Sequence, residues 1–180
     1  MKKTVRKLFW IWDFDKEEKW INDMSAKGMQ LCGVGYCKYV FEEGMPDEYV
    51  YRMEMLDRMP GKAESRQYIK FIEDTGAECI GSLLRWVYFR KKSGEGGFDL
   101  FSDIASRIKH LNRILWLIGI LFAINLFNAT NQFFFWLREG WGPYLALLIV
   151  CLALEILLGY GFVHIYLKKL RLKRDRLLHE

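Results

Sequence analysis

The sequence has little histidine and none of the common catalytic signatures. The chain has 180 residues and three histidines, His110, His164 and His179, so a histidine-dependent active site in residues 1–98 is excluded. The G-x-S-x-G, P-loop, HExxH and G-x-G-x-x-G patterns are also missing. We therefore expect a protein that is not an enzyme and that holds no cofactor.

Cysteines with the spacing of a metal or redox site are missing as well. Cys32 and Cys37 are five positions apart, which is not a C-x-x-C pair, and Cys79 stands alone. Cys151 lies inside a long apolar run. Small buried thiols in a reducing compartment explain these residues, so neither a metal centre nor a disulfide framework is expected.

Charge is missing from most of the C-terminal half. The run Ile114–Phe135 has no charged residue over 22 positions, and Pro143–Leu167 has a single acid, Glu155, near its centre. About 20 mostly apolar residues are enough for a helix to cross the hydrocarbon core of a bilayer. The break Trp136–Gly142 is long enough for a tight turn. The sequence predicts two transmembrane helices, at 114–136 and 143–167, joined as a hairpin.

The basic residues predict the orientation of this hairpin. The apolar run near the N-terminus has only five residues before Asp13, fewer than a signal peptide needs, so we expect the front part not to be exported. The hairpin loop has only Arg138, beside Glu139. The basic residues that flank the outer ends of the two runs are Arg107, Lys109, Arg113, Lys168, Lys169, Arg171, Lys173, Arg174 and Arg176. The positive-inside rule then predicts a multi-pass protein of the cell membrane with both termini in the cytoplasm.

The excess of positive charge lies in the membrane half. Residues 1–98 have 17 Lys and Arg against 16 Asp and Glu, whereas the remainder has 10 against 6. A nucleic-acid-binding domain would carry the excess itself, so nucleic acid is not an expected partner. The basic tail, residues 168–180, is expected to lie near anionic lipid headgroups, where each well-placed basic residue contributes ~1 kcal/mol.

Residues 1–97 show one pattern of elements twice. The first half predicts a strand at 7–12, a helix at about 16–27 and strands at 29–34 and 36–41. The second half predicts a strand at 49–56, a helix at 65–75 and strands at 77–81 and 85–88. Gly28 and Gly76 stop the two helices, and Ala77–Gly81 matches Met29–Gly33 at an offset of 48. We predict a duplicated β-α-β-β unit with a ferredoxin-like α+β fold.

A juxtamembrane amphipathic helix at 98–113, with Ser102 as its N-cap and Asp103 in its first turn, should continue into the first span.

Polar residues inside the spans form the first candidate site. In an antiparallel hairpin, Glu155 lies at the depth of Ala123–Asn125, and Asn125, Asn128 and Asn131 make a polar stripe at every third position. An acid near the middle of a membrane needs a partner. Glu155 is expected to form a hydrogen bond with Asn125 or with the equivalent residue of another subunit. The polar stripe and Glu155 therefore favour a homo-oligomer. The alternative is that Glu155 takes part in ion, proton or polar-ligand binding.

Charged and aromatic residues of the front domain form the second candidate site. Arg52 and Glu54 alternate with apolar neighbours, so they are expected on the sheet face that helices leave open. The residues that we assign to this face are Trp10, Trp12, Lys38, Arg52, Glu54 and Arg85. The three interpretations are a solvated face with cross-strand ion pairs, a docking surface for a second copy or a protein partner, and a small-ligand pocket.

The run Phe9–Gly28, FWIWDFDKEEKWINDMSAKG, resembles the domain-of-unknown-function family 2812 of Gram-positive bacteria. Tyr49–Glu54, Tyr68–Gly76 and Phe98–Asp103 are similar to later blocks of that family. The resemblance covers about residues 6–113. It implies C-terminal membrane spans and, because the family's genes often lie near those of PadR-type repressors, a regulatory role. The family has no established activity, so the resemblance implies no catalytic residue.

Together these features favour an integral membrane protein with a cytoplasmic sensing or interaction module. The alternative is an accessory or pore-forming subunit of a transporter that uses the intramembrane Glu155.

Overall fold

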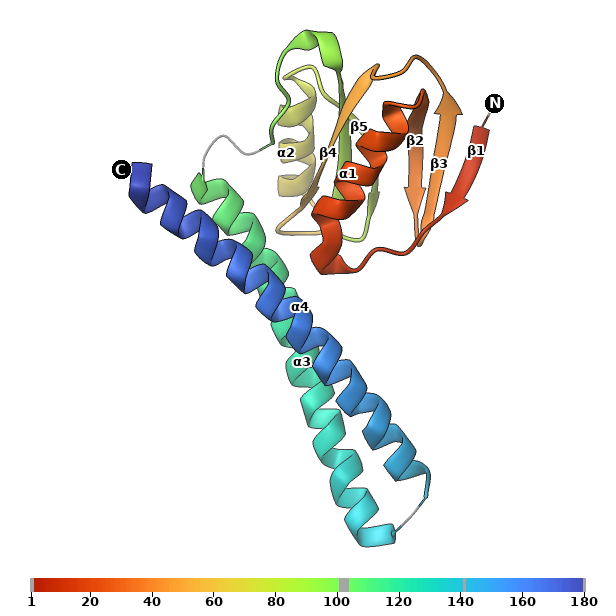
Figure 1. Cartoon of the computed structure of the whole chain (residues 1–180), viewed down its shortest axis with the longest axis vertical. Helices are drawn as coiled ribbons and strands as arrows, with labels where there is room; N and C mark the ends of the chain where they lie inside the picture. The colour runs from red at the N-terminus through yellow and green to blue at the C-terminus, as the bar shows by residue number, and fades with distance from the viewer. Residues whose placement is uncertain (1, 101–103, 141, 180) are drawn as a thin grey trace. The chain divides into compact units, whose positions relative to one another are not determined.

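The computed structural model describes residues 2–100, 104–140 and 142–179. Its internal contacts divide the chain into two compact units, Met1–Asp103 and Ile104–Glu180, which we describe separately. The first unit is an α+β domain and the second is a pair of long helices (Figure 1). The predicted α+β class is therefore confirmed, together with the apolar helix pair that follows it.

The α+β domain contains two antiparallel sheets of three strands each. The strand order is β1-β3-β2 in one sheet and β4-β6-β5 in the other, so the strands do not form a single ferredoxin-like sheet. Two short 3-10 helices, Ile11–Asp13 and Ser93–Glu95, complete the domain. The main elements in chain order are β1 (Lys2–Arg6), α1 (Phe14–Ser25), β2 (Met29–Gly35), β3 (Lys38–Glu43), β4 (Tyr49–Met55), α2 (Ala63–Glu73), β5 (Glu78–Leu83) and β6 (Trp86–Lys92).

The two halves of the domain share their element order and a local irregularity. Each half runs β-α-β-β, and the pairing register shifts at Leu31/Gly33 in β2 and at Cys79/Gly81 in β5. β2 and β5 are neighbours: a Cβ added to Gly81 would lie 3.2 Å from Val34 Cγ2. A bulge bends a strand and interrupts its ladder. The two bulged strands therefore adjoin without merging their sheets.

The predicted helix stops are confirmed, and one predicted strand is wrong. Gly28 and Gly76 have φ of 78° and 89°, a backbone region in which glycine carries no Cβ penalty. Their amides donate to Ser25 O at 2.8 Å and to Glu73 O at 2.9 Å. The strand expected at 7–12 is instead β1, at Lys2–Arg6. Within 7–12 the apolar side chains divide between the core and the surface: Trp12 is 3% exposed, whereas Leu8 and Trp10 are 59% and 46% exposed.

Helices cover both faces of β6, which explains why four successive residues of that strand are buried. Trp86 packs against Phe14 of α1, with ring centroids 5.6 Å apart, and Tyr88 bonds to the same helix. The intervening Val87 and Phe89 belong to a separate cluster on the side of α2. Full burial of such an apolar side chain contributes about 1.5–3 kcal/mol. The buried members of the cluster are Leu56, Ile72, Ala77, Val87 and Phe89.

Side chains of α1 form hydrogen bonds with the backbone groups at the free edge of β4. Asn22 accepts from Tyr51 N at 2.9 Å and donates to Tyr51 O at 3.0 Å. Glu18 accepts from Met53 N at 3.0 Å, and Ser25 Oγ donates to Tyr49 O at 2.7 Å. Backbone groups at a sheet edge need such partners when they are buried. These bonds fix α1 against the second sheet.

The second unit consists of two helices that are long and apolar enough to span a membrane. α3 (Ile104–Glu139) runs without a break through the first apolar run, and α4 (Pro143–His179) carries the second (Figure 1). Ser102 and Asp103, the expected helix cap, lie outside the described residues. In the most apolar 18-residue segment of each helix, only 22% of the residues of α3 and 6% of those of α4 are buried. A core helix of a soluble protein is mostly buried, and these two helices are not.

Candidate functional site

The structure does not place the six predicted face residues on one open surface. Trp12 and Glu54 are 3% and 4% exposed. Glu54 accepts a hydrogen bond from Tyr68 Oη of α2 at 2.5 Å. The expectation that Glu54 points away from the core was wrong because α2 covers that side of β4.

The other four residues make separate contacts. Arg52 lies 3.4 Å from Glu18 Oε1, and Arg85 Nε donates to Leu56 O at 2.7 Å. Lys38 is exposed at the start of β3. Trp10 stacks on the buried Trp12, with ring centroids 5.3 Å apart and planes 4° from parallel. Trp10 also lines a cavity of the domain.

This cavity, which we call the aromatic cavity, has a volume of about 220 Å³. It lies where the segment before α1 meets the tips of two equivalent hairpins, the β2–β3 turn at Tyr36-Cys37 and the β5–β6 turn at Leu84-Arg85. Half of the lining residues are aromatic. The aromatic members are Phe9, Trp10, Phe14, Tyr36, Tyr39, Trp86 and Tyr88.

A buried carboxylate and two phenols form the polar wall of the aromatic cavity. Glu17 Oε1 accepts from Tyr39 Oη at 2.8 Å and from Tyr88 Oη at 2.6 Å. Burial raises the pKa of Glu17, and the two hydroxyls oppose this shift. Burial, followed by the neighbouring charge of Glu17, raises the pKa of both tyrosines. In the part of the chain that the structure describes, no basic side chain forms an ion pair with Glu17.

The rim of the aromatic cavity is apolar and exposed. Leu8, Trp10, Tyr36 and Leu84 are 59%, 46%, 84% and 72% exposed. Cys37 and Leu84, one at each hairpin tip, have φ of 49° and 54°. A non-glycine residue in this region stores about 1–3 kcal/mol of strain. Strain and exposed apolar surface at one place are typical of a surface kept for binding.

The hairpin holds a polar contact at the depth that the sequence indicates. Asn125 Nδ2 donates to Glu155 Oε1 at 3.0 Å and to Cys151 O at 2.8 Å. Glu155 Oε2 is buried and has no hydrogen-bond partner among the described residues. The rest of the stripe does not join this contact: Asn131 donates to Phe127 O of its own helix at 2.9 Å, and Asn128 is exposed.

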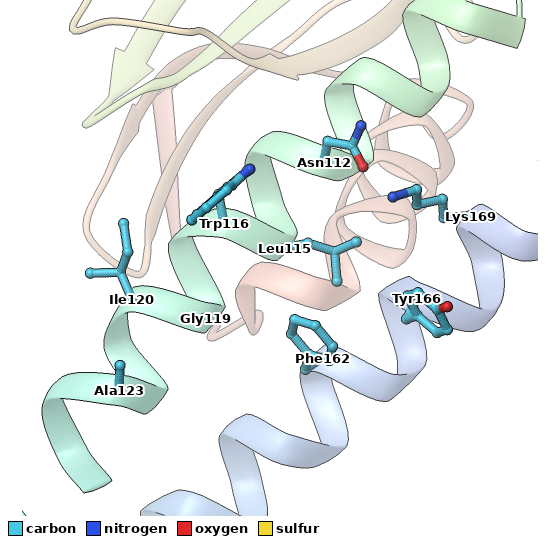
Figure 2. A pocket seen from close by; sticks show the side chains of 9 residues that line it. All are labelled: Asn112, Leu115, Trp116, Gly119, Ile120, Ala123, Phe162, Tyr166 and Lys169. Carbon is cyan, nitrogen blue, oxygen red and sulfur yellow. The ribbon is translucent and has the colours of Figure 1, made fainter. Parts of the chain in front are cut away.

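A groove of about 490 Å³ runs along one side of the α3–α4 pair (Figure 2). Asn112 and Lys169 lie at one end, and Ile120 and Ala123 lie toward the other. A Cβ on Gly119 would meet nothing within 4 Å, so the groove is open beside it. The remaining lining residues are Leu115, Trp116, Phe162 and Tyr166.

The family model for proteins of unknown function, DUF2812, matches residues 13–123. The chain belongs to the DUF2812 family. The match runs from the residue before α1 into α3 and contains Glu17, Tyr39 and Tyr88. No curated protein and no solved structure matches the chain. For this DUF2812 protein, function is therefore argued from its sites.

Sequence reasoning missed the aromatic cavity of the DUF2812 domain because Glu17 lies in the first turn of α1, where the helix dipole alone accounts for an acid. The available signal was its spacing from Phe14 and Ile21, which are both buried on α1. Glu17 is an acid on the apolar stripe of an amphipathic helix. Across the described residues, no group of three or more His, Cys, Asp or Glu could hold a metal ion.

Proposed function

We propose that this DUF2812 protein is an integral membrane protein whose N-terminal domain is a non-catalytic sensing module in the cytoplasm, with a regulatory role. The aromatic cavity carries the proposal. It combines a concave apolar wall, three converging polar groups and a raised pKa at Glu17, which are the usual marks of a small-molecule site. Its exposed rim also offers a surface where a protein partner can bind and distinguish the ligand-bound form from the free form.

The test uses the full chain in lipid nanodiscs and a low-molecular-weight extract of host cytoplasm. The extract should raise the Tm of the wild-type domain, because a ligand stabilises the state that binds it. Trp10→Ala should reduce the shift, whereas Met59→Ala, with 48% exposure against 46% for Trp10, should keep it. No shift with any extract fraction would contradict the sensing role.

We propose that α3 and α4 cross the membrane with both termini in the cytoplasm. The helices are about 54 and 56 Å long at 1.5 Å per residue, against a hydrocarbon core of ~30 Å, so the basic outer ends reach past the core. Arg138 lies 3.6 Å from Glu139 at the other end, which leaves that end without excess charge. Reporter fusions at Gly140 and after His179 should report opposite sides. Equal signals would refute this topology.

We propose that anionic lipids bind at the basic end of the hairpin, with a headgroup at Lys169 and an acyl chain in the groove of Figure 2. The groove is polar where the membrane surface would lie and apolar further along α3. Gly119→Leu should fill it and weaken binding of phosphatidylglycerol, whereas Gly142→Leu, outside the groove, should not. Equal lipid binding by both variants would oppose the site.

We propose that the spans self-associate as a homo-oligomer. Asn128 is exposed on α3 between Phe127 and Ala129, and amides in a membrane hydrogen-bond across helices. Asn128→Leu should therefore lower the oligomer mass in mild detergent. An unchanged mass would argue against this contact.

We also propose that the two β-α-β-β halves arose by duplication, which their bulges 48 residues apart support.

A second candidate function is favoured by Glu155 alone. Its Oε2 is buried without a partner among the described residues, so a proton or cation is a chemically suitable occupant. In that case the protein would be an accessory or pore-forming subunit of a transporter. Ion flux in liposomes that disappears with Glu155→Ala would support this alternative, and no flux in the wild type would remove it.

A further inference from the structure

We propose that the aromatic cavity binds a small organic ammonium cation, with Glu17 as its counter-charge and the surrounding rings as its walls. This inference rests on the proposed sensing function and names the class of ligand. Three properties of the cavity support it: the unpaired carboxylate, the aromatic lining and the volume.

The carboxylate of Glu17 is buried without a counter-cation. Its side chain is 8% exposed, and its hydrogen-bond partners are two neutral phenols. Buried acids are normally paired with a cation, because hydrogen bonds alone offset only part of the lost hydration. Tyr39 and Tyr88 donate to the same oxygen and hold the carboxylate at the cavity wall. Lys7 also lines the cavity, but its Nζ lies over the rings of Phe9 and Trp20 and forms no ion pair with Glu17 in the described part of the chain. A bound cation would therefore supply the missing counter-charge.

The aromatic lining favours the same class of ligand. The face of an aromatic ring attracts cations, and cages of rings recognise alkylammonium groups. This corner of the domain already holds one ammonium group: Lys7 Nζ lies 4.8 Å from the ring centroid of Phe9 and 4.5 Å from that of Trp20. An anion would be repelled by Glu17, and a neutral ligand would leave its charge unpaired.

The volume limits the size of the cation. The cavity holds about 220 Å³, less than the ~300–1,000 Å³ of pockets for drug-sized ligands. A compact group such as trimethylammonium fits this limit, and a longer substituent would pass the apolar rim at Trp10 and Tyr36. The ammonium group can belong to a free small molecule or to a lipid headgroup.

The test compares choline with 3,3-dimethylbutan-1-ol, a neutral molecule of the same shape. The full chain is placed in phosphatidylglycerol nanodiscs, which contain no ammonium headgroup, and binding is followed by tryptophan fluorescence and calorimetry. Choline should bind at least about tenfold more tightly than the neutral alcohol. Glu17→Gln should remove this preference, and Trp10→Ala should weaken choline binding. Asp23→Asn, on the exposed side of the same helix, should change nothing.

Each outcome decides the proposal. Equal affinity for the two probes, or an unchanged preference in Glu17→Gln, would overturn it. If Glu17→Gln fails to fold, Trp10→Ala decides, because that side chain is 46% exposed and its loss leaves the core intact. Competition by added phosphatidylethanolamine assigns the site to a lipid headgroup, and its absence assigns the site to a free cation. A Tm shift by cytoplasmic extract without any choline binding would overturn the ligand class and leave the sensing function standing.

Discussion

Replacement of Asn22 by alanine tests how α1 is held on the second sheet. The Asn22 side chain accepts a hydrogen bond from the backbone N–H of Tyr51 at 2.9 Å and donates one to the backbone C=O of Tyr51 at 3.0 Å. A hydrogen bond contributes about 0.5–1.5 kcal/mol, and a buried backbone group left without a partner costs about 1–3 kcal/mol. Tyr51 O keeps its hydrogen bond from Arg52 Nη1 at 3.0 Å, so the Tyr51 N–H is the group left without a partner. Asn22→Ala should therefore lower the free energy of unfolding of the domain by about 1–3 kcal/mol.

Urea unfolding of the full chain in mild detergent, followed by tryptophan fluorescence, measures this change. Asp23→Ala is the matched control on the adjacent, exposed position, and it should stay within about 0.5 kcal/mol of the wild type. Hydrogen exchange of the Tyr51 amide should also accelerate in Asn22→Ala. A loss below about 0.5 kcal/mol with unchanged exchange would refute the role of α1 as the partner of this strand edge.

Three further predictions concern single positions. Burial raises the pKa of Glu17 above 4.5, so the stabilisation from its protonated form is complete below pH 4.5 and is lost as pH rises through the folded-state pKa. The difference in unfolding free energy between wild type and Glu17→Gln, measured in urea, should therefore shrink across that pH range. Parallel pH profiles of the two proteins would contradict the shift. Gly28→Ala should destabilise the domain by about 1–3 kcal/mol, because φ is 78° and the new Cβ would lie 2.9 Å from Gly44 O. Gly61→Ala is the control, because its Cβ would meet no atom within 4 Å. Equal unfolding midpoints of the two variants would be evidence against the backbone constraint at Gly28. Asn125→Leu should weaken the hairpin by about 0.6–2 kcal/mol in detergent unfolding, and a more stable variant would show that the contact with Glu155 is not structural.

Local signals were sufficient to predict most elements of the domain. Gly28 and Gly76 marked both helix ends correctly because each adopts positive φ. The offset of 48 between Leu31 and Cys79 also reappears in the structure as the spacing of two bulges. Such features depend on a few adjacent residues, so the sequence alone contains them.

Features that depend on distant segments were not predictable in the same way. Alternation along β4 indicates two faces, but it does not show that α2 covers the second face and buries Glu54. Glu17 looks like an ordinary acid in the first turn of a helix until Tyr39 and Tyr88, which follow much later in the chain, are placed beside it. The contact between Asn125 and Glu155 was easier to anticipate, because a tight hairpin fixes which depths face each other.

The most direct test of the account is hydrogen–deuterium exchange of the full chain in nanodiscs, with and without the cytoplasmic extract. Ligand in the extract should add protection only in the three segments that line the aromatic cavity, residues 7–17, 36–39 and 83–88. No added protection, or protection only in other segments, would contradict the assignment of this cavity as the sensing site.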